Sequence, residues 1–464
     1  MITESLLERL RTLVDPGRVL TDEDSLRSFG CDWTRLYEPA PSAIVFPRST
    51  EQVQAIVLFA NQNGVGLVPS GGRTGLSAGA VAANGEVVVA FDQMNRILEF
   101  AETDRTVSCQ AGVVTRELQE FAREKGLFYP VDFAAAGSSQ LGGNLATNAG
   151  GIKVIRYGMT RDWVAGLTAV TGRGDVLRLN KDLVKNATGY DLRHLFVGAE
   201  GTLGFITEAT MRLARPPENL NVMVLGVDTM ANIMRVLHAF RKRLDLTAFE
   251  FFSDQALGHV LASGNLARPF ATPTPFYALL EFEASSDRTI EEAMEIFETC
   301  TEAGWAREGV MSQTSAQAKS LWRLREDISE AISEHTPYKN DLSVTVSRVP
   351  AFVEEIDRIV AAHYPRFEIV WFGHIGDGNV HLNILKPAGM PKDEFFAQCR
   401  VVNEWVFDAV RRHEGSVSAE HGIGLMKKEY LGYSRSPEEI AYLKAIKRAF
   451  DPNNVMNPGK IFDP

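Results

Sequence analysis

The spacing of hydrophobic residues predicts helices in the first part of the chain. Four leucines near the N-terminus recur at the three- and four-residue intervals of one helix face, and Thr3 before them is a residue type that caps helices; they are Leu6, Leu7, Leu10 and Leu13. EQVQAIVLFANQNG (51–64) and TRELQEFAREKG (115–126) repeat this spacing. Each ends in a glycine, which terminates helices readily.

Short apolar, β-rich runs alternate with these helices. SAIVFPRST (42–50), GLVPSGG (66–72) and EVVVAFDQM (86–94) are predicted strands. The alternation continues to about residue 215, which predicts a mixed α and β architecture for this half. The two prolines of ARPPEN (214–219) indicate a boundary.

Longer amphipathic segments follow the boundary. SDRTIEEAMEIFETC (286–300) and AQAKSLWRLREDISEAIS (316–333) are predicted helices, and FYALLEFEA (276–284) is a predicted strand. The tail, about 411–464, is predicted to be helical and ends in DPNNVMNPGKIF.

FGHIGDGNVHLNIL (372–385) predicts a hairpin. A two-residue Asp377-Gly378 loop would pair His374 with His381 on one face, and Asn383 would share that face. Two adjacent imidazoles are suited to a divalent metal. A buried, hydrogen-bonded polar pair explains the same pattern, so both interpretations stay open at this point.

Composition excludes several classes of function. The net charge of −11 argues against binding to nucleic acid or to an anionic membrane surface. The chain has no apolar run long enough for a membrane span, and its N-terminus is not a signal peptide. We expect a cytoplasmic protein in a reducing compartment, and an organelle protein without its transit peptide stays open. The cysteines are scattered and form no paired motif: Cys31, Cys109, Cys300 and Cys399.

Three glycine-rich stretches indicate that backbone approaches a ligand closely. They are SGGRTGLSAGAV (70–81), AGSSQLGGNLATNAGG (136–151) and KNATGYDLRHLFVGAEGTLGFIT (185–207). Glycine lets successive N–H groups turn toward phosphate oxygens. The first stretch is neither a Walker loop nor a GxGxxG fingerprint, and alone it is equally consistent with a turn.

In this order, the three stretches resemble the FAD-binding half of vanillyl-alcohol-oxidase-like flavoproteins, especially the D-lactate and D-2-hydroxyglutarate dehydrogenases. The resemblance covers nearly the whole chain. It implies an α+β fold, with a PCMH-type FAD-binding domain of two α+β subdomains and a cap domain with an antiparallel sheet and flanking helices. It implies a discontinuous FAD domain over 1–215 and 415–464, to which NPGKIF (457–462) returns, and a substrate- and metal-binding cap over 216–414.

The resemblance also implies the residues that contact FAD. FAD is expected to be noncovalent, because no histidine precedes His194 and none lies in the first two loops. The implied contacts are Pro69, Ser70, Gly71, Gly72, Arg73, Thr74, Gly75, Leu76, Ser77, Gly137, Ser138, Gly142, Gly143, Asn144, Thr147, Asn148, Gly151, Tyr157, Gly158, Glu200, Gly201, Gly204, Ile206 and Asn457.

FGHIGDGNVHLN and SVSAEHGIG (416–424) resemble the second domain of the same dehydrogenases. There the matching residues bind a divalent metal, usually zinc, which implies His374, His381 and Glu420 as ligands; manganese and cobalt have similar preferences. Three protein ligands leave a position for substrate. His421 resembles the family's catalytic base and a substrate contact, and a merely hydrogen-bonded histidine is the alternative.

Cationic residues elsewhere resemble a clamp for a second carboxylate. Arg325, Ser329 and Lys339 match the residues that bind the distal carboxylate in D-2-hydroxyglutarate dehydrogenases, with serine where some members have threonine. Asn383 is expected to hold the C1 carboxylate. The alternative for Arg325 is an ion pair with its helix neighbours Glu326 or Asp327.

The resemblance implies a dehydrogenase that uses FAD and a metal to oxidise a small 2-hydroxy dicarboxylate, D-2-hydroxyglutarate or D-malate. A D-lactate or glycolate dehydrogenase subunit is the runner-up, and an electron-relaying flavin subunit with a structural metal is a third hypothesis. Without an iron–sulfur motif or a nicotinamide fingerprint, we expect an electron-transfer flavoprotein or a quinone as acceptor. A homodimer stays open.

Overall fold

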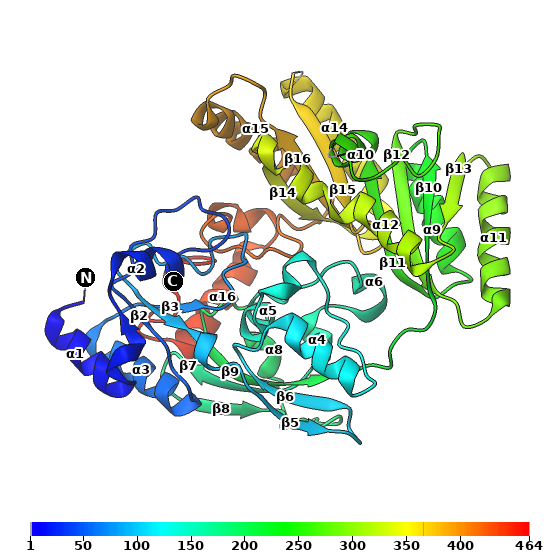
Figure 1. Ribbon diagram of the computed structural model, residues 1–464. Helices are drawn as coiled ribbons and strands as arrows, with labels where there is room; N and C mark the ends of the chain where they lie inside the picture. Colours follow the sequence, from blue (N-terminus) through cyan, green and yellow to red (C-terminus); the bar gives the residue numbers. More distant parts are fainter. Residues whose placement is uncertain (1, 263, 365, 464) are drawn as a thin grey trace. The chain divides into compact units, whose positions relative to one another are not determined.

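The computed structural model describes residues 2–262, 264–364 and 366–463 (Figure 1). The chain forms two compact units. The first unit contains residues 1–150, 159–216 and 420–464, and the second contains 151–158 and 217–419. The boundaries expected from the sequence lay after 215 and 414, and the grouping of 151–158 with the second unit was not expected. None of the helices in the described ranges is both long and apolar enough to cross a bilayer.

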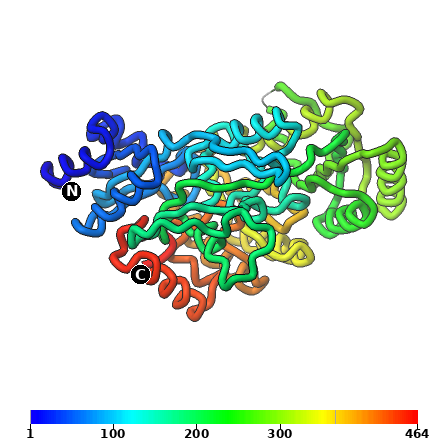
Figure 2. Tube along the Cα trace, turned by 90° about the horizontal axis from the view of Figure 1, so that it is seen from below, coloured from blue at the N-terminus to red at the C-terminus, as the bar shows by residue number. Residues whose placement is uncertain are grey.

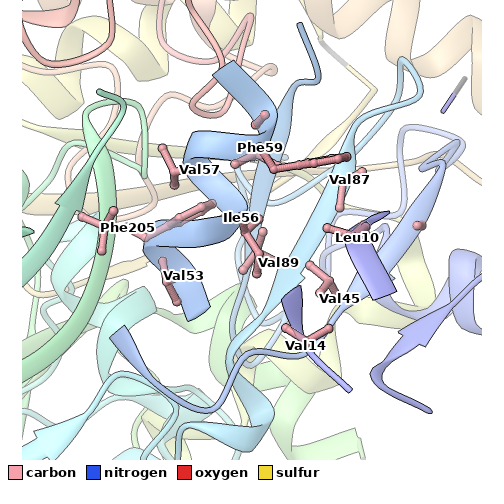
Figure 3. Close-up of a cluster of buried hydrophobic side chains, with 14 of the residues drawn as sticks. Leu10, Val14, Val45, Val53, Ile56, Val57, Phe59, Val87, Val89 and Phe205 are labelled. Carbon is pink, nitrogen blue, oxygen red and sulfur yellow. The ribbon is translucent and has the colours of Figure 1, made fainter. Parts of the chain in front are cut away.

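A four-stranded sheet opens the first unit. Its order is β1 (Val19–Leu20), β2 (Ala43–Val45), β4 (Val87–Ala90) and β3 (Leu67–Ser70), with the last three parallel. This part of the chain also contains helices α1 (Glu4–Leu13), α2 (Glu23–Phe29) and α3 (Thr50–Asn63). Buried residues of α3 and β4 belong to one apolar cluster, in which Figure 3 shows Ile56 near Val89 and Phe59 near Val87, with Val57 on the side of Phe205.

A five-stranded antiparallel sheet completes the first unit (Figure 2). Its order is β5 (Ile97–Ala101), β6 (Thr106–Gln110), β9 (Gly204–Arg212), β7 (Val164–Thr171) and β8 (Val176–Leu179). Its helices are α4 (Thr115–Glu124), α5 (Leu141–Thr147), α7 (Thr160–Trp163), α8 (Arg193–Phe196) and the C-terminal α16 (Pro437–Phe450).

The second unit is built on a seven-stranded antiparallel sheet. Its order is β13 (Glu308–Met311), β10 (Leu220–Val227), β12 (Phe276–Glu283), β11 (Leu246–Ser253), β15 (Glu368–Gly373), β16 (Asn379–Leu385) and β14 (Tyr338–Ser343). Its helices are α6 (Val154–Tyr157), α9 (Met230–Arg241), α10 (Asp254–Ala262), α11 (Asp287–Glu302), α12 (Ser315–Glu326), α13 (Ile328–Ala331), α14 (Val349–His363) and α15 (Lys392–Arg412).

Local signals in the sequence predicted the first helices and strands correctly. The hydroxyl of Thr3 accepts a hydrogen bond from the amide of Leu6 and so caps α1. Gly64 ends α3 with a φ of 63°, a left-handed conformation that glycine adopts without a steric penalty. The single helix expected over 316–333 was wrong, because the chain turns at Asp327 and divides it into α12 and α13.

The predicted register of the histidine hairpin was also wrong. The strands pair Phe372 with His381, so His374 lies in the connection and not in the ladder. The connection contains residues 374–378, and Gly378 within it has a φ of 90° and lies tightly against the backbone of Val344. His381 and Asn383 nevertheless point to one face of β16, as the two-residue period of a strand requires.

A buried ion pair fastens the C-terminal segment to the first unit. The Lys447 ammonium pairs with Asp451 and donates hydrogen bonds to the carbonyl oxygens of Thr202 (2.8 Å) and Met456 (2.7 Å). The Asp451 carboxylate also accepts from the amides of Val455 and Met456, at 3.0 and 2.8 Å. This network fixes the backbone that leads to Asn457.

Replacing Lys447 by methionine should strongly destabilise the first unit. The change leaves the Asp451 carboxylate buried without its cation, which typically costs about 3–5 kcal/mol. Thermal and urea melting of the FAD-loaded protein would measure the loss. Arg448→Met, on the exposed face of the same helix, should stay within about 0.5 kcal/mol. Equal shifts for the two variants would contradict this account.

Candidate active site

The first two glycine loops lie side by side in the first unit. Gly72 is so close to the second loop that an added Cβ would lie 2.1 Å from the Ser138 carbonyl oxygen. At Gly71 the nearest atoms belong to the Gln140 side chain. A bulkier residue at position 72 would push the loops apart, so glycine there sets the spacing of this surface.

The third loop joins the same surface from the start of β9. Gly201 has a φ of 72°, and a Cβ there would lie 2.6 Å from the Pro69 ring at the end of β3. The guanidinium of Arg73 pairs with Asp92 at 3.1 Å and donates to the Gly71 carbonyl oxygen at 2.8 Å. Arg73 therefore supports its own loop from within.

The implied FAD contacts are distributed as follows. Pro69 and Ser70 end β3, and Gly71, Gly72, Arg73, Thr74, Gly75, Leu76 and Ser77 follow in the loop; Gly137 and Ser138 form a turn; Gly142, Gly143, Asn144 and Thr147 lie in α5, with Asn148 as its cap; Glu200 and Gly201 precede β9, which contains Gly204 and Ile206. Gly151, Tyr157 and Gly158 belong to the second unit.

The loop surface has polar atoms suited to a bound ligand. Asn457 donates from Nδ2 to the carbonyl oxygens of Gly79 (2.8 Å) and Glu200 (2.7 Å). Its Oδ1, and the Oε1 of Gln140, are buried and have no hydrogen-bond partner among the described residues. Buried acceptors without partners are costly, so donors of a bound molecule would stabilise them. These residues fit FAD.

The carboxylate of Glu200 holds the segment that follows His421. It accepts hydrogen bonds from the amides of Ile423 (2.7 Å) and Gly424 (2.8 Å), and burial raises the pKa of this carboxyl group while the two amides oppose the rise. The Ser77 carbonyl oxygen accepts two more amides of this segment, at 3.1 and 3.2 Å. Glu200 was predicted as a FAD contact, and the sequence did not indicate this second role.

In the second unit, one face of the seven-stranded sheet gathers the polar residues. The strand register pairs Phe252 with Phe372, Phe372 with His381 and His381 with Asp341, and paired residues share a face. Residues two apart on a strand share it too. The face therefore includes Glu250, Phe252, Phe372, His381, Asn383, Lys339 and Asp341.

The predicted metal ligands gather at the end of this face. One ligand atom each from His374, His381 and Glu420 lies within 4.8 Å of the others. The two imidazole rings are 5.4 Å apart. Glu420 follows Ala419 directly, and the Ala419 amide donates to the Asp341 carbonyl oxygen at 3.4 Å. Two imidazole nitrogens and a carboxylate oxygen are a donor set that zinc prefers, so these residues fit a divalent metal.

His421 lies next to the last of these ligands. Its Nε2 is 3.6 Å from the Glu420 carboxylate, and Asp341, Glu420 and His421 form a second group of convergent donor atoms.

Two buried carboxylates lie next to the Nδ1 atoms of the two histidines. The sequence analysis missed both. Glu250 accepts from His374 Nδ1 at 2.9 Å, and Asp341 lies 3.8 Å from His381 Nδ1. Both carboxylates are about 1% exposed. Glu250 could have been noticed in the sequence, because it lies inside the apolar run LTAFEFFS (246–253) and a buried charge requires a partner.

Arg325 is buried beside this histidine system. Its Nη2 forms an ion pair with Glu250 Oε2 at 2.9 Å without hydrogen-bond geometry, and its guanidinium carbon lies 4.7 Å from the centre of the Phe372 ring. Asp327, one of the two helix neighbours considered as alternative partners, pairs instead with Arg323. The Nε of Arg325 is buried with no hydrogen-bond partner among the described residues. It is therefore a donor available to a ligand.

The other three predicted substrate residues differ in exposure. Ser329 is exposed and follows the turn at Asp327. Lys339 faces Asn383 across the strand pair and is exposed, while desolvation of its ammonium lowers its pKa. The Asn383 amide donates to the carbonyl oxygens of Val370 and His381, at 3.3 and 3.4 Å.

Comparisons with known proteins agree with this architecture. Residues 41–180 match the model of the FAD binding domain, and residues 216–461 match that of the C-terminal domain of FAD linked oxidases. A D-2-hydroxyglutarate dehydrogenase of Stutzerimonas stutzeri is 67% identical over 462 residues, which cover 100% of both chains. A mitochondrial D-2-hydroxyglutarate dehydrogenase of Danio rerio is 35% identical over 463 residues, covering 99% of this chain and 85% of the relative.

A solved structure confirms the predicted fold class. p-Cresol methylhydroxylase with bound substrate superposes with a TM-score of 0.79 at 16% identity, covering 100% of this chain and 98% of the other. The chain therefore belongs to the FAD-linked oxidase family of oxidoreductases, together with the D-2-hydroxyglutarate dehydrogenases to which it is similar.

Proposed function

We propose that this protein oxidises D-2-hydroxyglutarate to 2-oxoglutarate by hydride transfer to noncovalent FAD, with the help of a divalent metal. The main support for the proposal is that the candidate metal ligands and two cations lie at the same face of the seven-stranded sheet. Lys339 lies on that face, and Arg325 of α12 contacts two of its residues, Glu250 and Phe372. The names of the relatives support the choice of substrate.

Different residues would bind the two carboxylates of the substrate. Arg325 and Lys339 would bind the distal carboxylate, because a guanidinium and an ammonium form charge-assisted hydrogen bonds with it. Asn383 would contact the C1 carboxylate by turning its NH₂ group away from the carbonyl oxygens of Val370 and His381, to which it now donates. Ser329 would add a hydroxyl. D-Lactate has no second carboxylate, so it would leave both cations without their partner.

The chemistry requires a base and two bound groups. His421 would accept the proton of the 2-hydroxyl, a task suited to a neutral imidazole near pH 7. His374, His381 and Glu420 would hold the metal, which as a Lewis acid favours loss of that proton. FAD, when bound, supplies the acceptor for the hydride from C2. We propose an electron-transfer flavoprotein or a quinone as the subsequent acceptor, and a cytoplasmic location.

The decisive experiment follows the absorbance of the oxidised flavin without oxygen. Rapid loss of absorbance with D-2-hydroxyglutarate but not with D-lactate, abolished by a chelator and restored by zinc, is the expected result. Equal reduction by D-lactate would favour the D-lactate dehydrogenase alternative. If neither acid reduced the flavin, the electron-relay alternative with a structural metal would replace the proposal.

Arg325→Met should reduce kcat/KM for the dicarboxylate by about 10–100-fold, the loss of a hydrogen-bonded charge worth about 1.5–3 kcal/mol. Activity on D-lactate, however low, should change by less than about threefold. Arg323→Met on the same helix is the matched control, because Arg323 is exposed and pairs with Asp327. A loss of the same size for both acids would assign Arg325 a purely structural role.

The dependence of KM on pH should reveal the loss of the positive charge on Lys339. Its ammonium is charged below its pKa, and burial lowers that pKa from the ordinary 10.5. Raising the pH should therefore remove the charge, and raise KM for D-2-hydroxyglutarate, at a lower pH than an exposed lysine would. In Lys339→Met, KM should be high throughout and lose this alkaline rise, whereas Lys319→Met, at an exposed position of α12, should retain it. An identical alkaline rise in both variants would exclude Lys339 as the source.

A further inference from the structure

We propose that Glu250 is a positioning residue that fixes both the metal ligand His374 and the substrate-binding Arg325. This inference rests on the proposed function, which assigns those two roles. Glu250 lies on β11, between a loop histidine and a helix arginine that are 124 and 75 residues away in the chain. It touches both at 2.9 Å, one with each carboxylate oxygen.

The first contact selects a tautomer of His374. An ionised carboxylate only accepts hydrogen bonds, so the proton of a neutral imidazole must be on Nδ1, the atom that faces Glu250. The lone pair is then on Nε2, which is the nitrogen a metal would bind. Carboxylates that hold a ligating histidine in this way orient the ring and increase its basicity, and their loss typically weakens metal binding about 10–100-fold.

The second contact fixes the direction of Arg325. The Nη2 forms an ion pair with Glu250, and the guanidinium carbon lies over the Phe372 ring. These two contacts determine where the remaining donors point, including the unpartnered Nε. Because the two oxygens of one carboxylate hold both groups, a shift of Glu250 moves the metal ligand and the substrate cation together.

Glutamine cannot reproduce this arrangement. Its amide is uncharged and has one acceptor oxygen and one NH₂ group, whereas position 250 faces the Nδ1–H of His374 and the cationic guanidinium of Arg325. In Glu250→Gln, an amide that keeps its oxygen toward His374 turns its NH₂ group toward the guanidinium, and the ion pair is lost. Glu250→Asp retains two acceptors on a shorter side chain, so it should weaken both contacts less than glutamine does.

Zinc affinity tests the inference without depending on turnover. The FAD-loaded protein would be stripped of metal and titrated with zinc against a chromophoric chelator. Glu250→Gln should bind zinc about 10–100-fold more weakly than the parent and should also raise KM for D-2-hydroxyglutarate. Lys339→Met, which leaves the Glu250 carboxylate paired, should raise KM alone, with zinc affinity within about threefold of the parent.

Glu281→Gln is the matched control. Glu281 is a carboxylate on the adjacent strand β12, 4% exposed, which pairs with Lys153 and accepts from Trp322 Nε1 at 2.9 Å. Its loss removes a buried ion pair but touches neither candidate histidine ligand, so zinc affinity should stay within about threefold. Equal weakening in the Glu281 and Glu250 variants would reduce Glu250 to a structural residue and overturn the inference.

His381→Ala separates failure of the inference from failure of the proposed function. If His381→Ala loses zinc but Glu250→Gln binds it like the parent, the metal site stands and the role of Glu250 is overturned. If the parent and His381→Ala bind zinc equally, the proposed metal site is wrong and the inference falls with it. Should Glu250→Gln not fold, Glu250→Asp decides by the same comparison, with parental zinc affinity and KM overturning the inference.

Discussion

A carboxylate buried in an apolar sheet must be compensated by cations or hydrogen-bond donors, and this constraint organises the second unit. Glu250 is 1% exposed in a strand that is otherwise apolar apart from hydroxyl groups. The compensation comes from Arg325 on α12 and His374 in the hairpin connection. Helix, strand and loop are thereby held together by one side chain. Because breaking a buried pair is expensive, these three elements keep a fixed geometry, which a metal site requires.

In the first unit, a buried carboxylate is compensated by backbone amides. Glu200 is fully enclosed, and its carboxylate accepts the amides of Ile423 and Gly424, more than 220 residues away in the chain. Asn457 binds the carbonyl oxygen of Glu200 from the C-terminal segment, which Lys447 and Asp451 anchor. The glycine loops, the segment beyond His421 and the tail therefore form one hydrogen-bonded surface. A loop with many glycines gains its order from such contacts and not from its own conformational preferences.

The sequence predicted what depends on local chemistry. Thr3 and Gly64 mark helix ends by capping and by a left-handed backbone, which need no distant partner. The hairpin register was wrong, and β16 pairs on its other side with β14, a strand outside the hairpin that the Asp377-Gly378 signal does not take into account. The roles of Glu250 and Glu200 were missed for a related reason. Each acts through partners that are at least 75 residues away, and spacing patterns carry no information on such pairs.

The two cations of the predicted clamp differ in exposure, which favours a rigid contact from one of them and an adjustable contact from the other. Arg325 is buried and held by Glu250 and Phe372, so it loses little conformational entropy when it meets a carboxylate. Lys339 is exposed, so ordering its long side chain against a ligand would cost more conformational entropy. Under the proposed function, the fixed arginine would set the direction in which a second carboxylate must lie, and the lysine would add charge. An acid without that carboxylate would gain neither contribution, whereas a metal in the cluster would act on both acids alike. Selectivity on this view comes from α12 and β14, and reactivity from the histidine hairpin and the residues that follow Ala419.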